Sequence, residues 1–152
     1  MKQFAKARMA LIAVTLLSSP SVGHAQQKAQ SYQPLSNQEM AQMGIWDQWV
    51  KTYNELTAKQ KAEVMRRHIN MCLDSFQLTD DQRTFVKDFT AKYVNDGMYD
   101  ADPEKRAAIQ REMQPIQQQA TSVLGPDLTQ KFFAAKPPIA VLEAVKSDPA
   151  FK

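Results

Sequence analysis

The chain has few of the residues on which most catalytic and metal sites depend. Its 152 residues include one cysteine, Cys72, two histidines and four glycines. A single cysteine cannot form an intrachain disulfide, and scattered glycines cannot build the clustered loop that cradles a phosphate. The sequence contains no His-Glu-x-x-His pattern and no pair of cysteines at metal-binding spacing. These absences predict a protein that is not an enzyme and that carries no cofactor.

The first 25 residues are typical of a secretory signal peptide. Basic residues precede an apolar run from Met9 to Leu17, and Gly23 and Ala25 provide the small side chains that a signal peptidase reads. We therefore expect cleavage after Ala25 and export to a bacterial periplasm or to the medium. No later segment approaches the roughly 18 apolar residues that a membrane helix needs, so we expect no membrane insertion.

The excess of basic residues in the chain comes from this leader. The whole sequence has 19 basic and 16 acidic residues. Residues 1–25 hold three of the basic residues and no acidic ones, which leaves 16 of each sign in the rest. A nucleic-acid-binding surface needs a basic surplus on the folded part of the chain. We therefore expect no nucleic-acid partner.

Apolar residues after the leader recur at steps of three and four, and no stretch alternates with a period of two. The pattern predicts an all-α fold, either a small bundle or an elongated assembly of helical hairpins, with four to six helices. The first helix begins at Ser36 and contains Gly44. The fourth begins at Asp102, is kinked at Pro115 and ends at Gly125-Pro126.

The sequence also predicts how these helices are grouped along the chain. Residues 1–25 form the cleaved signal peptide, and the polar, glutamine-rich residues 26–35 form a disordered arm. Residues 36–147 form a single all-α domain, and residues 148–152 form a tail.

One short phrase occurs twice, as Leu-Thr-Ala-Lys-Gln in residues 56–60 and Leu-Thr-Asp-Asp-Gln in residues 78–82. In each copy a threonine precedes a glutamine by three residues, which is the spacing of a helix-capping box. The predicted capping residues are Thr57, Gln60, Thr79 and Gln82.

Met65, His68 and Cys72 form a candidate site for a soft metal. At 100° per residue they lie within about 60° of arc on one helix. Thioether, imidazole and thiolate ligands together suit Cu(I) or zinc. The alternative, which the apolar pattern favours, is that Met65 and Cys72 are core residues with His68 beside them. Cys72 is then either buried or paired with a second chain.

Trp46, Trp49 and Tyr53 form an aromatic stripe on the first helix. The stripe either packs in the core of a bundle or forms an exposed apolar surface that binds a partner protein. The three residues are therefore candidates for protein binding.

The doubled Leu-Thr-x-x-Gln phrase, in an all-α chain with a signal peptide and no cysteine pair, resembles the Spy/CpxP family of small periplasmic proteins. The resemblance covers about residues 56–133. Residues 124–128 stand where a further copy is expected, with Gly in place of Thr and Leu in place of Gln. The family includes chaperones that act without ATP, envelope-stress modulators and metal-responsive sensors.

The resemblance implies a periplasmic protein that binds other proteins, as a homodimeric holdase chaperone for unfolded clients or as an envelope-stress modulator. Two alternatives stay open. One is a metal-binding or metal-sensing protein that uses Met65, His68 and Cys72, and the other is an interaction module with one dedicated partner.

Overall fold

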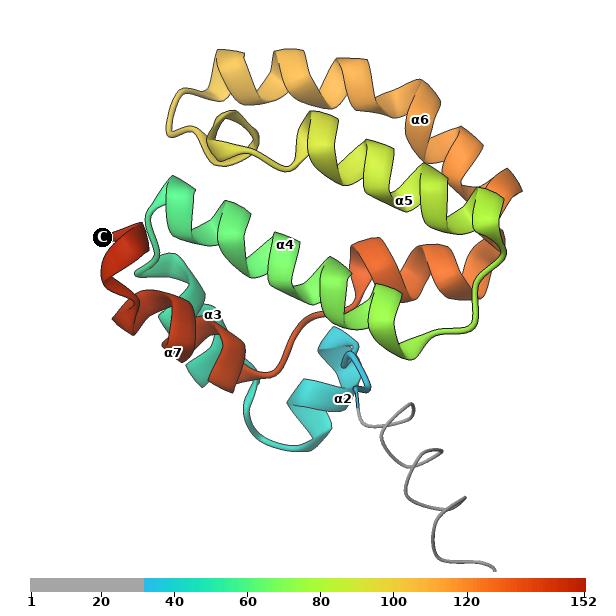
Figure 1. Cartoon of the computed structure of the whole chain (residues 1–152). Coiled ribbons are helices and arrows are strands. Elements are labelled where there is room, and N and C mark those ends of the chain that lie inside the picture. The colour runs from blue at the N-terminus through green and yellow to red at the C-terminus, as the bar shows by residue number, and fades with distance from the viewer. Residues whose placement is uncertain (1–31) are drawn as a thin grey trace, which may run out of the picture.

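A computed structural model describes residues 32–152, so the expected signal peptide and residues 26–31 lie outside the described chain. Within residues 32–152 the fold is all-α, as predicted, with six α-helices, short helical turns and no β-strand (Figure 1). The elements are α2 (Asn37–Gln42), α3 (Trp46–Asn54), α4 (Ala58–Ser75), α5 (Asp80–Tyr93), η1 (Asp96–Tyr99), α6 (Pro103–Thr129), η2 (Gln130–Ala134), α7 (Ile139–Ser147) and η3 (Pro149–Phe151).

Helix α4 lies between two hydrophobic cores. In Figure 1, α5 and α6 lie on one side of α4, and α3 and α7 lie on the other. The first core joins α4 to α5, α6 and η2, and the second joins α4 to α2, α3 and α7. The first core contains Tyr32, Ile69, Cys72, Leu73, Val86, Phe89, Tyr93, Val94, Met113, Leu124 and Phe132. The second contains Met40, Trp49, Leu56, Val64, Leu142 and Val145.

The apolar residues of α4 therefore serve both cores. Val64 packs in the second core, whereas Ile69 and Leu73 pack in the first. A helix that is apolar on more than one side is buried on more than one side. This double burial makes α4 the central element of the fold.

The predicted first helix is two helices. Ser36 begins α2 with the expected capping box to Glu39, but α2 ends at Gln42 and α3 begins at Trp46. Gly44 has a φ of 71°, in the region that glycine adopts at little cost. The prediction of one continuous helix from Ser36 is wrong because Gly44 turns the chain.

The main interruption of α6 lies at Gly125. Pro115 is inside the helix, and the one residue of α6 with non-helical backbone angles is Gly125, with φ 79° and ψ 166°. The predicted break at Gly125-Pro126 is confirmed. Pro115 keeps helical backbone angles, which a proline kink also does, so the predicted kink at Pro115 stays a prediction.

Residues 32–35 of the predicted disordered arm are packed against the domain. The Tyr32 side chain is 5% exposed. Leu35 and Lys136 exchange two backbone hydrogen bonds, of 3.0 and 2.7 Å. For these four residues the prediction of disorder is wrong, because one aromatic side chain and one bridge fix the segment.

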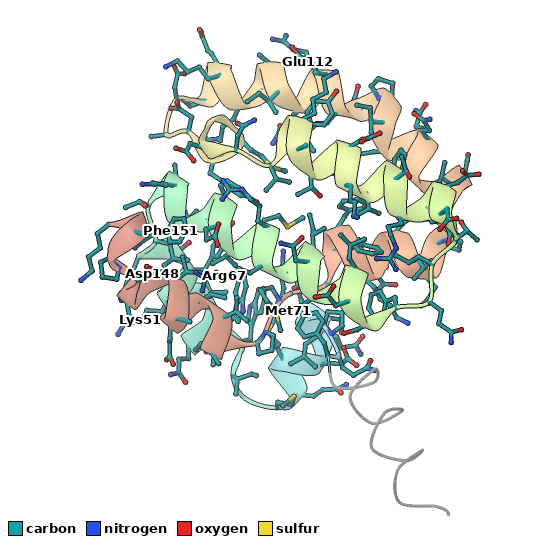
Figure 2. The ribbon with its side chains drawn as sticks, in the orientation of Figure 1. Lys51, Arg67, Met71, Glu112, Asp148 and Phe151 are labelled. Atoms are coloured by element: carbon teal, nitrogen blue, oxygen red, sulfur yellow. The ribbon has the colours of Figure 1, made fainter. Side chains whose placement is uncertain are left out.

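The C-terminal residues, predicted to be a tail, form η3 and pack against α4. The Asp148 carboxylate accepts a hydrogen bond from the Ala150 backbone amide at 3.0 Å. It also forms an ion pair with the Arg67 guanidinium at 3.0 Å. The Phe151 ring lies under the Arg67 guanidinium, 5.6 Å away, and packs against the second core (Figure 2). The ordered chain therefore extends through Phe151.

Candidate functional site

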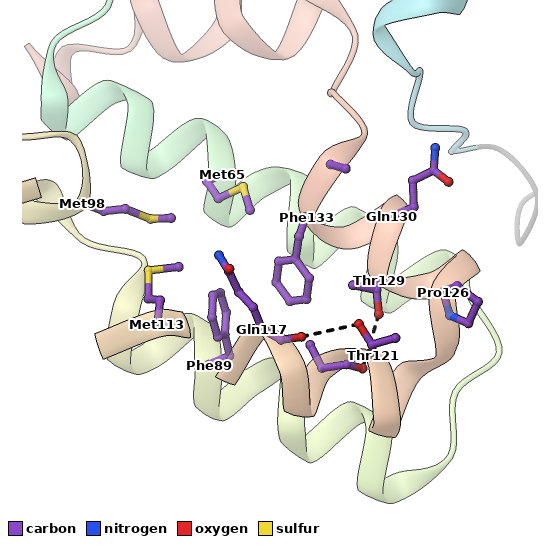
Figure 3. Close-up of a pocket in the computed structure, with 12 residues that line it drawn as sticks. Met65, Phe89, Met98, Met113, Gln117, Thr121, Pro126, Thr129, Gln130 and Phe133 are labelled. Carbon is purple, nitrogen blue, oxygen red and sulfur yellow. Dashed lines mark hydrogen bonds between the residues drawn. The ribbon is translucent and has the colours of Figure 1, made fainter. Parts of the chain in front are cut away.

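A pocket of about 480 Å³ opens between α4, α5, η1, α6 and η2 (Figure 3). Its volume is in the range of about 300–1,000 Å³ that is usual for ligand sites. We call it the methionine pocket, because three of its side chains are methionines. It is lined by Met65, Phe89, Met98, Met113, Gln117, Ala120, Thr121, Pro126, Thr129, Gln130, Phe133 and Ala134.

The break at Gly125 shapes one wall of this pocket. It redirects the chain so that residues 126–134 fold back toward α4 and α5. The Thr129 hydroxyl holds the turn, since its Oγ1 lies 2.7 Å from the Gly125 carbonyl oxygen and 3.3 Å from that of Ala120. The π-helical turn η2 then places Phe132 in the first core and Phe133 in the pocket wall.

The floor of the pocket is apolar and its rim is polar. Phe89, Met113 and Ala120 are buried, and the Phe89 and Phe133 rings meet edge to face at 4.8 Å. Exposed residues, including Gln117, form the rim; the others are Thr121, Pro126, Gln130 and Ala134. None of the described lining residues carries a charge. The site therefore suits a neutral, apolar group that also offers hydrogen-bonding atoms at its edge.

His68 is the centre of a second, fully buried cluster. Its Nε2 lies 3.0 Å from the Lys131 carbonyl oxygen and 3.1 Å from that of Phe132. Carbonyl oxygens only accept, so Nε2 carries the proton, and Nδ1 accepts the hydrogen bond from the Tyr32 hydroxyl at 2.6 Å. Burial lowers the pKa of His68, and nearby Lys136 lowers it further, against the two carbonyls that raise it. The imidazole is thus a neutral connector between α4, η2 and residue 32.

The predicted metal set of Met65, His68 and Cys72 is divided between these two sites. Met65 lines the methionine pocket, whereas the Cys72 sulfur lies 3.9 and 4.0 Å from the His68 ring nitrogens. Both ring nitrogens already have hydrogen-bond partners, and burial raises the pKa of the Cys72 thiol to about 12. Within residues 32–152, no group of three or more histidine, cysteine or acidic side chains is arranged to hold a metal ion. Metal binding by this set stays a prediction.

The aromatic stripe packs in the second core. Trp46 and Trp49 stack with ring centroids 5.9 Å apart, and Trp49 and Tyr53 stack at 5.0 Å. Trp49 is buried, and its indole nitrogen donates to the Pro137 carbonyl at 2.9 Å. Trp46 and Tyr53 are partly exposed. Trp49 is therefore a core residue, and within the stripe only the partly exposed Trp46 and Tyr53 are open to a partner protein.

Both predicted capping boxes are present. The Thr57 hydroxyl accepts a hydrogen bond from the backbone amide of Gln60 at 3.2 Å, and the Thr79 hydroxyl accepts one from the backbone amide of Gln82 at 3.2 Å. In each box the glutamine side chain accepts from the threonine amide in return. The Gln82 side chain also donates to the Val123 carbonyl at 3.1 Å, so the second box joins α5 to α6. The boxes begin helices and lie outside the pocket.

Sequence reasoning did not find the methionine pocket. Met98 lies in a short turn and Phe133 in a π-helical turn, and neither element has a helical stripe that points to a shared site. The one local signal was the Gly125-Pro126 pair, which predicts a change of chain direction.

The chain matches no family model, no curated protein and no solved structure. No helix within residues 32–152 is long and apolar enough to span a membrane.

Proposed function

We propose that this chain is an exported helical protein that binds apolar segments of other proteins in the methionine pocket. The observation that carries the proposal is an uncharged pocket of about 480 Å³ that is open to solvent at its rim. The resemblance to Spy/CpxP proteins supports the same class of function, and with it a periplasmic location and a homodimer.

The chemistry of the lining fits a peptide segment. Phe89, Phe133 and the methionines offer an apolar surface for a leucine or phenylalanine side chain. The side-chain amides of Gln117 and Gln130 stand at the exposed rim, where they can pair with backbone amides on either side of that side chain. A peptide presents both groups together, and a purely hydrocarbon ligand does not.

The size of the pocket favours weak and tolerant binding. Burying one leucine or phenylalanine side chain contributes about 1.5–3 kcal/mol, which is roughly a 10- to 150-fold gain in affinity. Methionine is unbranched and adapts to side chains of different shape. Such a site suits a holdase that takes many clients better than a module that recognises one dedicated partner, for which a tight fit is expected.

A direct test is the suppression of aggregation of a chemically reduced client protein. The pocket is blocked by Thr121→Trp, because Thr121 is an exposed lining residue where a large ring fits across the opening. Ser122→Trp is the matched control, since Ser122 is the next residue of α6, is also exposed and does not line the pocket.

We expect the original protein and the Ser122→Trp variant to suppress aggregation equally, and the Thr121→Trp variant to lose most of this activity. Circular dichroism establishes that both variants are folded. Equal suppression by the two variants contradicts the pocket as the binding site, and no suppression by the original protein contradicts the holdase function. If only one of a panel of unrelated clients is protected, the dedicated-partner alternative is correct.

A further inference from the structure

We propose that the methionine pocket also binds a soft monovalent metal ion, Cu(I) or Ag(I), through the thioether sulfurs of Met65, Met98 and Met113. This site goes beyond peptide binding and does not depend on it. It also differs from the set predicted from the sequence, with which it shares only Met65.

Three separate elements bring these methionines together. Met65 comes from α4, Met98 from η1 and Met113 from α6, and all three line one pocket. In Figure 3 they lie at the end of the pocket opposite Pro126, with their side chains directed into it.

The other methionines of the described chain are placed differently. Met43 is 61% exposed, Met40 is buried in the second core, and Met71 is packed against the first core. The convergence of Met65, Met98 and Met113 is therefore particular to this pocket.

The ligand atoms determine which ion fits. Thioether sulfur is a soft, uncharged ligand that selects Cu(I) and related ions, whereas magnesium, calcium and manganese need oxygen ligands. No aspartate, glutamate, histidine or cysteine is among the described lining residues. An uncharged pocket also admits a monovalent ion at a smaller desolvation cost than a divalent one.

The lining presents no electrostatic barrier to a cation. No lysine or arginine is among the described residues that line the pocket. The rings of Phe89 and Phe133 belong to the same wall, and aromatic faces attract cations. Met65 and Met98 are only partly buried, so rotation about their side-chain bonds can bring the sulfurs onto an ion that enters from solvent.

The buried cluster next to the pocket is a poorer site for the same ion. The His68 nitrogens are engaged with Tyr32 and with two backbone carbonyls. The Cys72 sulfur is fully buried and its thiol stays protonated, because burial raises its pKa to about 12. Binding there requires the loss of existing hydrogen bonds, whereas binding by the three methionines does not.

The test is a titration with Ag(I) in chloride-free buffer, followed by calorimetry and native mass spectrometry. The variants Met65→Leu, Met98→Leu and Met113→Leu keep the volume and apolar character of each side chain but remove its sulfur. Met43→Leu is the matched control at an exposed methionine outside the pocket. Each protein is measured both with Cys72 and with Cys72→Ala, so that ion taken up by the thiol is recognised.

We expect one equivalent of Ag(I) to bind with or without Cys72 and to be unaffected by Met43→Leu. Each pocket variant should weaken it at least about tenfold, since loss of even an outer-shell partner of a metal costs about 10- to 100-fold. Circular dichroism and thermal melting establish that the variants fold. Absence of uptake, uptake that disappears with Cys72→Ala, or uptake unchanged in the triple Met→Leu variant overturns the proposal.

Discussion

At the scale of single residues, the most strongly constrained polar side chain is the buried His68. His68 is 0% exposed, and every polar atom of its ring has a partner from elsewhere in the sequence. The ring accepts from Tyr32 and donates to the backbone of η2, so it is neutral in the folded protein. Because burial makes protonation of this ring less favourable in the folded chain than in the unfolded chain, the free energy of unfolding depends on pH.

The hydrogen bond from Tyr32 to His68 should contribute measurably to stability. Tyr32→Phe keeps the ring but leaves the buried Nδ1 atom without a donor, which costs about 1–3 kcal/mol in the free energy of unfolding. Urea denaturation measures this loss. The control is Tyr93→Phe, at a second buried tyrosine whose hydroxyl has no hydrogen-bond partner among the described residues. Equal losses in the two variants contradict the role of the Tyr32 hydroxyl.

The stability of the protein should fall as the pH is lowered through about 6.5. Folding lowers the pKa of His68, so the unfolded chain binds more protons than the folded chain in the window between about 6.5 and the lower folded value. Stability from this group is complete above that window and decreases within it, by up to about 1.4 kcal/mol per pH unit. Burial raises the pKa values of the neighbouring Tyr32 hydroxyl and Cys72 thiol, so these two groups stay neutral in this range.

The measurement is chemical denaturation between pH 5 and 7 for the original protein and for His68→Gln, which cannot titrate. The slope of stability against pH should be smaller in the variant. Glu39, Glu55 and Asp148, whose pKa values are lowered, change charge at more acidic pH. Equal slopes in the two proteins contradict the assignment of His68 as buried and neutral.

At the scale of elements, the break at Gly125 should be intolerant of any side chain. Its angles, φ 79° and ψ 166°, lie in a region that is essentially restricted to glycine. A Cβ atom at this position would meet nothing within 4 Å, so the cost of a substitution is backbone strain alone. Gly125→Ala and Gly125→Asn should each lower stability by about 1–3 kcal/mol.

Thermal and urea unfolding measure this effect, with Ser122→Ala in the same helix as the control. Because the break shapes the pocket, both glycine variants should also suppress client aggregation less well. A Gly125→Ala variant with unchanged free energy of unfolding contradicts the backbone conformation described for Gly125.

The helix starts could be predicted from the sequence because their signals are local. The boxes at Thr57 and Thr79 are formed by side chains three residues apart, and both occur as expected. Gly44 shows the limit of this reasoning, since the same apolar spacing continues on both sides of a residue that in fact turns the chain. A glycine within a helical pattern does not reveal from sequence alone whether it bends or continues the helix.

At the scale of the whole molecule, the all-α class could be predicted, but the two cores and the pocket could not. Tyr32 is a lone aromatic residue in a polar segment, and its partner His68 is 36 residues away. Phe151 near the C-terminus packs on the same helix from the opposite end of the chain. Contacts of this kind depend on the tertiary arrangement, and they cannot be predicted from the apolar periodicity of single helices.

The methionine pocket could not be predicted from the sequence either, because it also depends on the tertiary arrangement. Its walls come from five elements, and no pair of neighbouring residues indicates that Met65, Met98 and Met113 meet. The spacing of aromatic residues instead predicted the stripe of α3 as the candidate surface for protein binding. The central residue of that stripe, Trp49, is buried, and its indole nitrogen donates to the Pro137 carbonyl in the segment that leads to α7.

The central claim is that apolar protein segments enter the methionine pocket, and methionine methyl NMR tests it most directly. The protein is labelled at the methionine ε-methyl groups and titrated with a neutral peptide that contains leucine and phenylalanine. We predict that the signals of Met65, Met98 and Met113 shift together, that those of Met43 and Met71 do not, and that Thr121→Trp abolishes the shifts. Shifts confined to methionines outside the pocket, or no shifts at saturating peptide, contradict the account.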